Sequence, residues 1–306
     1  MKTLLVTGAT GFVGKHFAKA ALDKYEVVCL VRETSDISIL PEKIKCVYGD
    51  LSITEDLHNA TENIDFVVHL GAAVQSISKE ENYNINVIGT QKLVEACKKN
   101  GVKKIIHLSS INATFEERGI YGETKLQSED VVKQSGLPYV ILRPATIYGH
   151  GDKGVSATYK LLSKSKIVPI IGNALIRPIY VNDVNKAILS ALESKAALNN
   201  TYYIGGATKL TIRDYMEKVG DLTGTGKKTF VNLPAWPFKI IINLNEYLGK
   251  RWVMTYEQYL SMTQSKDLAI GPAEKDLNFK PIDFDTGLRL WLDEVKPHEN
   301  FTSARR

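Results

Sequence analysis

Two side chains that could together transfer a proton stand one helical turn apart in the stretch HLSSINATFEERGIYGETK. Tyr121 and Lys125 share one face if a helix begins near Tyr121, because side chains at i and i+4 are neighbours. A phenol is a weak acid at neutral pH, and a nearby ammonium makes it more acidic by stabilising the phenolate. Ser110 closes the preceding strand, and its hydroxyl could hydrogen-bond a substrate oxygen. We therefore predict the catalytic residues Ser110, Tyr121 and Lys125, with Ser109 as the alternative serine.

A glycine-rich turn near the start of the chain predicts a phosphate cradle. The stretch VTGATGFVG follows an apolar strand and leads into a helix, which is the context that a dinucleotide fingerprint requires. Gly8 permits the tight turn, Gly11 lets backbone N–H groups approach a pyrophosphate, and Gly14 lets the helix pack on the strand. The alternative is a tight turn without a ligand. The residues expected to contact the dinucleotide here are Gly8, Thr10, Gly11, Phe12, Val13 and Gly14.

The end of the second strand, EVVCLVRETS, bears on the choice of dinucleotide. A carboxylate at this place accepts a hydrogen bond from the ribose 2′-hydroxyl of NAD. Arg32 stands there instead, and its planar donor fork suits a 2′-phosphate. Glu33 follows one residue later and is expected to point the other way. We therefore predict NADP(H) as the preferred cofactor, with NAD(H) possible; alternatively, Arg32 only stacks on adenine or faces solvent.

The elements that must position these residues alternate along the chain. Short apolar runs such as TLLVT, EVVCLV, DFVVHL and KKIIHLS read as buried strands. Helical segments between them are expected to end at Gly101 and Gly136, and Ser52 with Glu55 predicts a capping box. Strands alternating with helices predict an α/β fold with a doubly wound parallel sheet. We expect a dinucleotide-binding Rossmann domain over 1–150, and a 151–306 segment that partly returns to the sheet and partly forms a smaller C-terminal substrate lobe.

Composition sets broad limits on the kind of protein. The 306 residues carry 39 basic and 34 acidic side chains, a net charge of +5 without a basic patch that would predict nucleic-acid binding. Three cysteines without paired spacing predict buried free thiols in a reducing compartment. No signal peptide or membrane-spanning segment is predicted. We expect a cytoplasmic protein that binds a small-molecule substrate, without a metal ion.

The chain resembles the extended short-chain dehydrogenase/reductase superfamily, also called the NAD-dependent epimerase/dehydratase family. The likeness covers essentially the whole length, and it is carried by TGATGFVG, GD, HLGAA, NVIGT, LSS, the Tyr121 and Lys125 pair, LRPATIYG and YVNDV. The resemblance implies that Lys125 also holds the nicotinamide ribose and that Asn86 stabilises the central helix. It also implies a possible homodimer. The further positions that it implies for cofactor contact are Asp50, Leu51, Gly71, Ala72, Ala73 and Pro144.

Two departures from the family pattern bear on the substrate. Nucleotide-sugar members place an arginine where this chain has Ile176, with Arg177 one position later, and the Arg-Pro-Gly-Asp stretch of those members is absent. We therefore favour an NADP(H)-dependent reductase or dehydrogenase that moves hydride between the cofactor and a carbonyl or secondary alcohol. The alternatives are a nucleotide-sugar epimerase or dehydratase with tightly bound NAD, and a non-catalytic dinucleotide-binding subunit or sensor.

Overall fold

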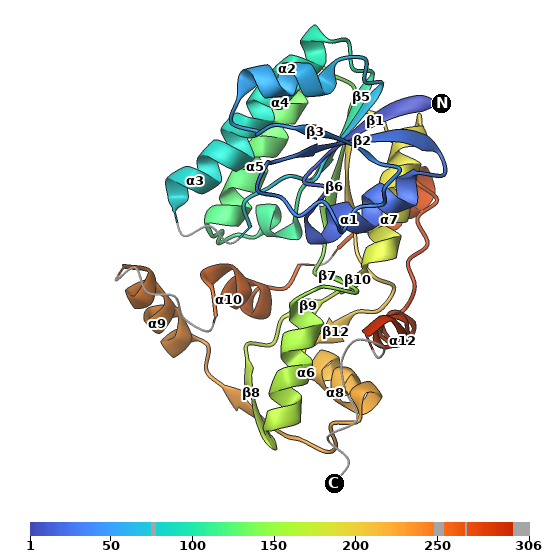
Figure 1. Ribbon diagram of the computed structural model, residues 1–306. Coiled ribbons are helices and arrows are strands. Elements are labelled where there is room, and N and C mark those ends of the chain that lie inside the picture. Colours follow the sequence, from blue (N-terminus) through green and yellow to red (C-terminus); the bar gives the residue numbers. More distant parts are fainter. Residues whose placement is uncertain (75–77, 248–253, 267, 296–306) are drawn as a thin grey trace. The chain divides into compact units, whose positions relative to one another are not determined.

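The computed structural model describes the chain except for residues 75–77, 248–253, 267 and 296–306 (Figure 1). The chain divides into two compact units. The first comprises Met1–Pro144, Val184–Ile204 and Ala269–Phe279, and the second comprises Ala145–Asp183, Gly205–Leu268 and Lys280–Arg306. No helix in the described ranges is long and apolar enough to cross a membrane.

A seven-stranded parallel sheet forms the centre of the first unit. Its strand order is β11-β6-β5-β4-β1-β2-β3, which confirms the predicted doubly wound sheet. The order reverses beside β1, and in such sheets the carboxyl ends of the strands at this point form the ligand crevice. The strands are β1 (Lys2–Thr7), β2 (Tyr25–Val31), β3 (Lys45–Tyr48), β4 (Phe66–His69), β5 (Lys104–Leu108), β6 (Tyr139–Pro144) and β11 (Asn200–Ile204).

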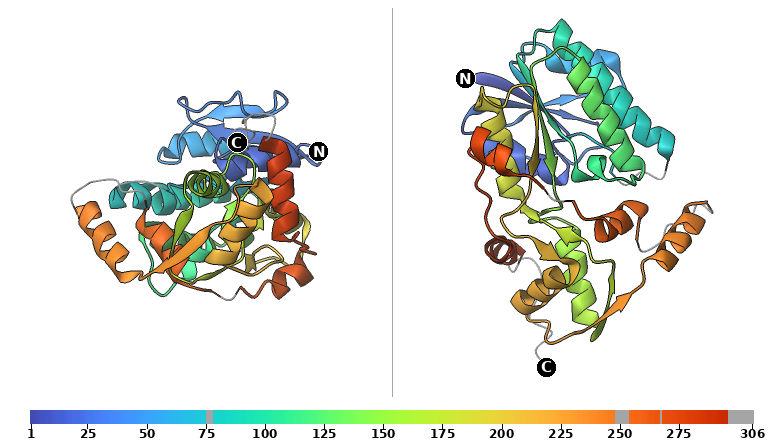
Figure 2. Two further views of the ribbon diagram at one scale, coloured as in Figure 1. Left: turned by 90° about the horizontal axis from the view of Figure 1, so that it is seen from below. Right: turned by 180° about the vertical axis from the view of Figure 1, so that it is seen from behind.

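Helices cover both faces of this sheet (Figures 1 and 2). Helices α2, α4 and α5 lie on one face, where Leu5, Leu57, Leu93, Ile105 and Val132 share a buried core. Helices α1 and α7 lie on the other face. The helical segments of this part of the chain are α1 (Phe12–Ala21), α2 (Thr54–Thr61), α3 (Lys79–Tyr83), the π-helical η1 (Asn84–Ile88), α4 (Gly89–Lys99), the 3-10 turn η2 (Ile111–Thr114), α5 (Ile120–Gln134), α7 (Val181–Glu193) and α11 (Gly271–Asp276).

The predicted helix ends are partly right. Gly101 and Gly136 follow α4 and α5 with φ angles of 70° and 76°, the left-handed conformation expected after a helix. The capping box of Ser52 and Glu55 is wrong, because α2 begins at Thr54 and no side chain caps it. The backbone N–H of Ser52 instead donates to the Asp50 carboxylate (2.8 Å), which organises the turn before the helix.

The second unit combines short strand pairs with helices. Its strands pair as β7 (Ile147–Tyr148) with β10 (Ile179–Tyr180), β8 (Ile167–Ile171) with β13 (Thr229–Leu233), and β9 (Leu175–Ile176) with β12 (Leu210–Thr211). Its helices are α6 (Gly154–Lys164), α8 (Ile212–Thr223), α9 (Trp236–Tyr247), α10 (Tyr256–Thr263) and α12 (Phe284–Val295). A capping box between Thr211 and Asp214 starts α8.

Candidate active site

The three glycines of the first turn have different structural roles. Gly8 adopts a φ of 70°, and a Cβ there would lie 2.6 Å from the Gly71 nitrogen. A Cβ on Gly14 would lie 2.1 Å from the Gly8 oxygen, so the helix can approach the strand only without a side chain. Gly11 is exposed, and the one neighbour of a Cβ there would be the Gly8 oxygen at 3.2 Å. The packing of the chain therefore requires Gly8 and Gly14, whereas a Cβ on Gly11 would be crowded only by this one backbone oxygen.

The start of α1 is suited to an anion. Gly11 is the N-cap residue of α1, and no side chain caps the helix. A helix start with unpaired backbone N–H groups and the positive end of the dipole favours a phosphate. The predicted contacts Thr10, Phe12 and Val13 are half-buried around this helix start.

Arg32 and Asp50 are electrostatically coupled at the ends of neighbouring strands. Arg32 is exposed directly after β2, and its backbone N–H donates to the Ser35 hydroxyl (3.2 Å). Asp50 follows β3 by two residues. Burial opposes ionisation of Asp50, but hydrogen bonds from Ser52 and the charge of Arg32 outweigh it and lower the pKa of the Asp50 carboxyl. A cation and an anion therefore lie at the edge where the sequence predicts the adenosine ribose.

The segment after β4 is held by side chains from two other elements. The Gly71 N–H donates to the Thr7 hydroxyl (3.2 Å) at the end of β1. Asn86, in the π-helical η1, accepts from the Ala73 N–H (2.7 Å) and donates to the Ala73 carbonyl (3.1 Å). Its Nδ2 also lies 2.9 Å from the Thr124 hydroxyl of α5. Asn86 therefore ties the predicted cofactor segment to the helix that carries Tyr121 and Lys125.

The remaining predicted cofactor residues lie at the same edge of the sheet. Leu51 packs against Gly71, since a Cβ on Gly71 would lie 2.9 Å from the Leu51 Cδ1. Ala72 is half-buried beside it. Pro144 is buried at the end of β6, where it pairs in register with Ile204 of β11. These positions come from different parts of the chain and meet because parallel strands end together.

Ser109 and Ser110 differ in the hydrogen bonds that their hydroxyls form. The buried Ser109 hydroxyl donates to the Glu129 carboxylate (2.6 Å), so its proton is committed to the interior. Ser110 is 9% exposed and caps η2, where its hydroxyl accepts from the Asn112 N–H (3.1 Å). A hydroxyl that accepts one hydrogen bond still has its own proton to donate. The geometry therefore favours Ser110 over Ser109 for contact with a substrate.

Tyr121 and Lys125 lie in the first two turns of α5, as the sequence predicts. The helix begins at Ile120, and its close packing on η2 depends on Gly122, where a Cβ would lie 2.6 Å from the Asn112 oxygen. Tyr121 is half-buried, whereas Lys125 is only 2% exposed. Burial lowers the pKa of Lys125 to about 7, and the Glu129 carboxylate opposes this shift.

A buried polar cluster lies behind the lysine, and we did not predict it. Glu129 is fully buried and accepts two hydrogen bonds from the Arg143 guanidinium (2.8 and 2.6 Å) and one from Lys133 (3.2 Å). Burial of Glu129 favours its neutral form, yet hydrogen bonds from Arg143 and Ser109 lower the pKa of its carboxyl. The four-residue spacing of Lys125, Glu129 and Lys133 was the available signal, because it places them on one helix face.

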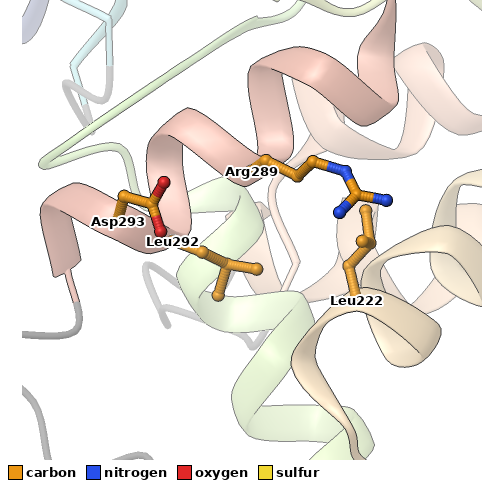
Figure 3. Close-up of a pocket in the computed structure, with 4 residues that line it drawn as sticks. All are labelled: Leu222, Arg289, Leu292 and Asp293. Carbon is orange, nitrogen blue, oxygen red and sulfur yellow. The ribbon is translucent and has the colours of Figure 1, made fainter.

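The second unit contains Arg177, which follows Ile176, the position where nucleotide-sugar members of the family have an arginine. Its guanidinium donates to the carbonyls of Gly206 (2.6 Å), Leu268 (3.2 Å) and Ala207 (3.5 Å). Arg177 therefore supports the backbone of its own unit. A hollow of about 210 Å³ lies between α8 and α12 and is lined by Leu222, Arg289, Leu292 and Asp293. Figure 3 shows these four side chains. None of these four residues belongs to the predicted site.

The fold and the glycine turn define the class as a dinucleotide-binding α/β protein of the Rossmann type. The chain belongs to the NAD dependent epimerase/dehydratase family, whose model matches residues 4–205. This confirms the resemblance to the extended short-chain dehydrogenases/reductases and the prediction of an enzyme of the dehydrogenase/reductase or epimerase/dehydratase type.

Relatives and solved structures show how wide this family is. An uncharacterized UDP-glucose epimerase, YtcB of Bacillus subtilis, is 27% identical over 72% of this chain and 82% of its own length. The decarboxylating sterol-4-alpha-carboxylate 3-dehydrogenase ERG26 of Candida albicans is 25% identical over 96% of this chain and 97% of its own. The structure of UDP-glucuronic acid 4-epimerase from Bacillus cereus, in complex with UDP-glucuronic acid and NAD, aligns with a TM-score of 0.76 at 25% identity, covering 98% of this chain and 100% of that one.

Proposed function

We propose that this enzyme is an NADP(H)-dependent oxidoreductase that transfers hydride between the cofactor and a carbonyl or secondary alcohol through Ser110, Tyr121 and Lys125. The observation that carries the proposal is the buried Lys125, one turn after Tyr121, on a helix packed against the turn that Ser110 caps. Burying a lysine costs free energy, so a lysine buried at this place indicates a functional role.

In this proposal each side chain has one task. The Ser110 hydroxyl donates a hydrogen bond to the substrate oxygen and holds it beside Tyr121. The Tyr121 phenol gives its proton to that oxygen during reduction and takes it back during oxidation. The Lys125 ammonium stabilises the phenolate that forms. The nicotinamide ring of the bound cofactor supplies or accepts the hydride.

The residues that would hold the cofactor fit a dinucleotide. The uncapped start of α1 and the exposed Gly11, which has no side chain, suit the pyrophosphate, and the segment from Gly71 to Ala73 is fixed at the same edge of the sheet. Arg32 supports a preference for NADP(H), because a guanidinium can pair with a 2′-phosphate in bidentate fashion. Asp50 would compete for the same guanidinium, which limits the strength of that preference.

The substrate class rests on two observations. ERG26, a sterol dehydrogenase, matches this chain over nearly the whole length of both. Arg177 is engaged by backbone carbonyls of its own unit and does not supply a free guanidinium for a sugar diphosphate. Both favour oxidation or reduction of an apolar-bodied substrate.

The second candidate is a nucleotide-sugar epimerase or dehydratase that retains NAD through each turnover. Its support is the similarity to YtcB and to the UDP-glucuronic acid 4-epimerase structure. Such an enzyme uses the same tyrosine and lysine but returns the hydride to the substrate, so it shows no net oxidation of NAD(P)H. A third possibility is a non-catalytic dinucleotide-binding subunit, against which the Tyr121 and Lys125 pair argues.

The test combines the copurified nucleotide with one substitution. We expect exchangeable NADP(H), and oxidation of NADPH with a member of a panel of steroid and other apolar ketones. Tyr121→Phe should lower turnover by about 100-fold or more and leave the NADPH dissociation constant nearly unchanged. The matched control is Tyr83→Phe, an exposed tyrosine of α3, which should keep parental turnover. Stoichiometric NAD with sugar epimerisation would establish the second candidate, and parental turnover in Tyr121→Phe would refute the catalytic assignment.

A further inference from the structure

The Lys125 ammonium has a histidine as its polar partner inside the first unit. Its Nζ atom lies 3.4 Å from Nε2 of His107, on β5, and both side chains are buried. No other hydrogen bond of Nζ is formed with the described residues. The same Nε2 atom lies 3.0 Å from the Ser128 hydroxyl, one turn along α5. The Lys125 amino group and the Ser128 hydroxyl, both on α5, therefore share the Nε2 atom of His107 on β5.

The protons available to these groups permit two arrangements. Ser128 donates to the Lys125 carbonyl (2.8 Å), so its oxygen is free to accept from Nε2–H. In that arrangement Nε2 carries the imidazole proton, and the facing lysine must be a neutral amine. If Lys125 is an ammonium, it donates to Nε2, which must then be bare, and the imidazole proton lies on Nδ1. Loss of one proton from Nζ therefore accompanies transfer of the imidazole proton from Nδ1 to Nε2.

The surroundings keep the imidazole uncharged in both arrangements. Burial and the charge of Lys125 hold the pKa of His107 well below its usual range, and His69 and Lys133 act in the same direction. His69 faces it from β4 with ring centroids 5.2 Å apart. Glu129 is the nearby anion, and Arg143 neutralises it from β6. The pair therefore responds to protonation of Lys125 and not to formation of an imidazolium.

The second ring nitrogen shows that His107 does not pass protons to solvent. Nδ1 is buried and has no hydrogen-bond partner among the described residues. A proton relay needs a hydrogen-bond partner at each ring nitrogen, and Nδ1 of His107 has none among the described residues. His107 can thus hold Lys125 in place, and its tautomer depends on the state of the lysine.

We propose that His107 is a positioning residue for Lys125, which holds the Nζ atom from the sheet side and changes tautomer when the lysine gains or loses its proton. The inference rests on the proposed function only in taking Lys125 as the catalytic lysine. Because burial brings the pKa of Lys125 to about 7, both arrangements are populated near neutral pH.

The test is nitrogen-15 NMR of the full chain with labelled histidine, recorded between about pH 6 and pH 9 across the expected transition. The His107 signal is assigned with His107→Gln. We expect the Nδ1–H tautomer at the acidic end and the Nε2–H tautomer at the basic end. His69 is the internal control, because Thr90 donates to the Asn86 carbonyl and must accept from His69 Nε2–H (3.0 Å). Its tautomer should not change.

Two variants separate the proposal from a merely structural role. In Lys125→Met the Nε2–H tautomer should persist at every pH, because no ammonium competes for Nε2. In Ser128→Ala that tautomer loses its oxygen acceptor, so the transition should move to higher pH. One tautomer of His107 throughout in the parent, or the same transition in Lys125→Met, would overturn the proposal. The spectra need neither cofactor nor substrate. They therefore test the role of His107 independently of the Tyr121→Phe assay, which tests the proposed function.

Discussion

Replacing Lys125 by methionine should stabilise the folded first unit at neutral pH, although it removes a residue proposed to be essential for turnover. The lysine is 2% exposed, and the one hydrogen-bond partner of its Nζ atom among the described residues is His107. Methionine fills nearly the same volume and has no charge to bury. The buried Lys125 would then lower the stability of the folded chain in return for its role in turnover, as is common at active sites.

The magnitude follows from the pKa. The pKa of Lys125 falls from 10.5 to about 7 through burial. Each tenfold change in acidity corresponds to about 1.4 kcal/mol, so keeping the proton in the folded chain costs roughly 3–5 kcal/mol below pH 7. Between the folded and unfolded pKa values the unfolded chain binds more protons, and the free energy of unfolding of the parent rises with pH. The advantage of Lys125→Met should therefore be greatest below about pH 7 and shrink as the pH rises.

The assay must report on the unit that contains Lys125. The first unit contains no tryptophan, so tryptophan fluorescence is unsuitable. Hydrogen exchange of the buried β5 amides, measured against urea at several pH values, gives the local free energy of unfolding. Lys98→Met, at an exposed lysine of α4, is the control and should change that free energy by less than about 0.5 kcal/mol. A Lys125→Met protein that is less stable than the parent, or a difference that does not vary with pH, would refute the reasoning.

Three further predictions concern the cofactor and the buried cluster. Arg32→Asp should raise the NADPH dissociation constant by roughly 10–100-fold and that for NADH much less, and an equal loss in calorimetric titrations of both would contradict the 2′-phosphate assignment. Gly11→Val should abolish dinucleotide binding with little change in melting temperature, whereas Gly14→Val should lower the melting temperature strongly; equal melting temperatures would show that the packing argument is wrong. Glu129→Gln should cost about 3–5 kcal/mol in urea unfolding at pH 7, because Arg143 keeps a buried charge without its partner. The pKa of the Glu129 carboxyl is lowered in the folded chain, so this stabilisation is present above the ordinary carboxyl range and is lost as the pH falls through the folded pKa. A difference in the free energy of unfolding between the parent and Glu129→Gln that persists in acid would contradict this prediction.

Short sequence patterns predicted the buried strands, the helix ends and the helix face that Tyr121 and Lys125 share. Continuous apolar runs identified the buried strands, and the left-handed glycines after α4 and α5 identified helix ends. The spacing of Tyr121 and Lys125 fixed their common helix face before any tertiary contact was known. The capping box at Ser52 failed because the Asp50 carboxylate accepts its N–H, and the sequence pattern does not show which of two competing acceptors is used.

The sequence by itself determined the parallel sheet, because strands and helices alternate along the chain. It also determined the glycine turn and the Tyr121 and Lys125 pair, because these depend on spacings within a few residues. Only the tertiary structure decided the surroundings of that pair. Ser109 is committed to Glu129, and Lys125 meets His107, because strands β5 and β6 place distant segments behind α5. The environment of a side chain depends on strand register and helix packing, and these arise from the whole core and not from neighbours in sequence.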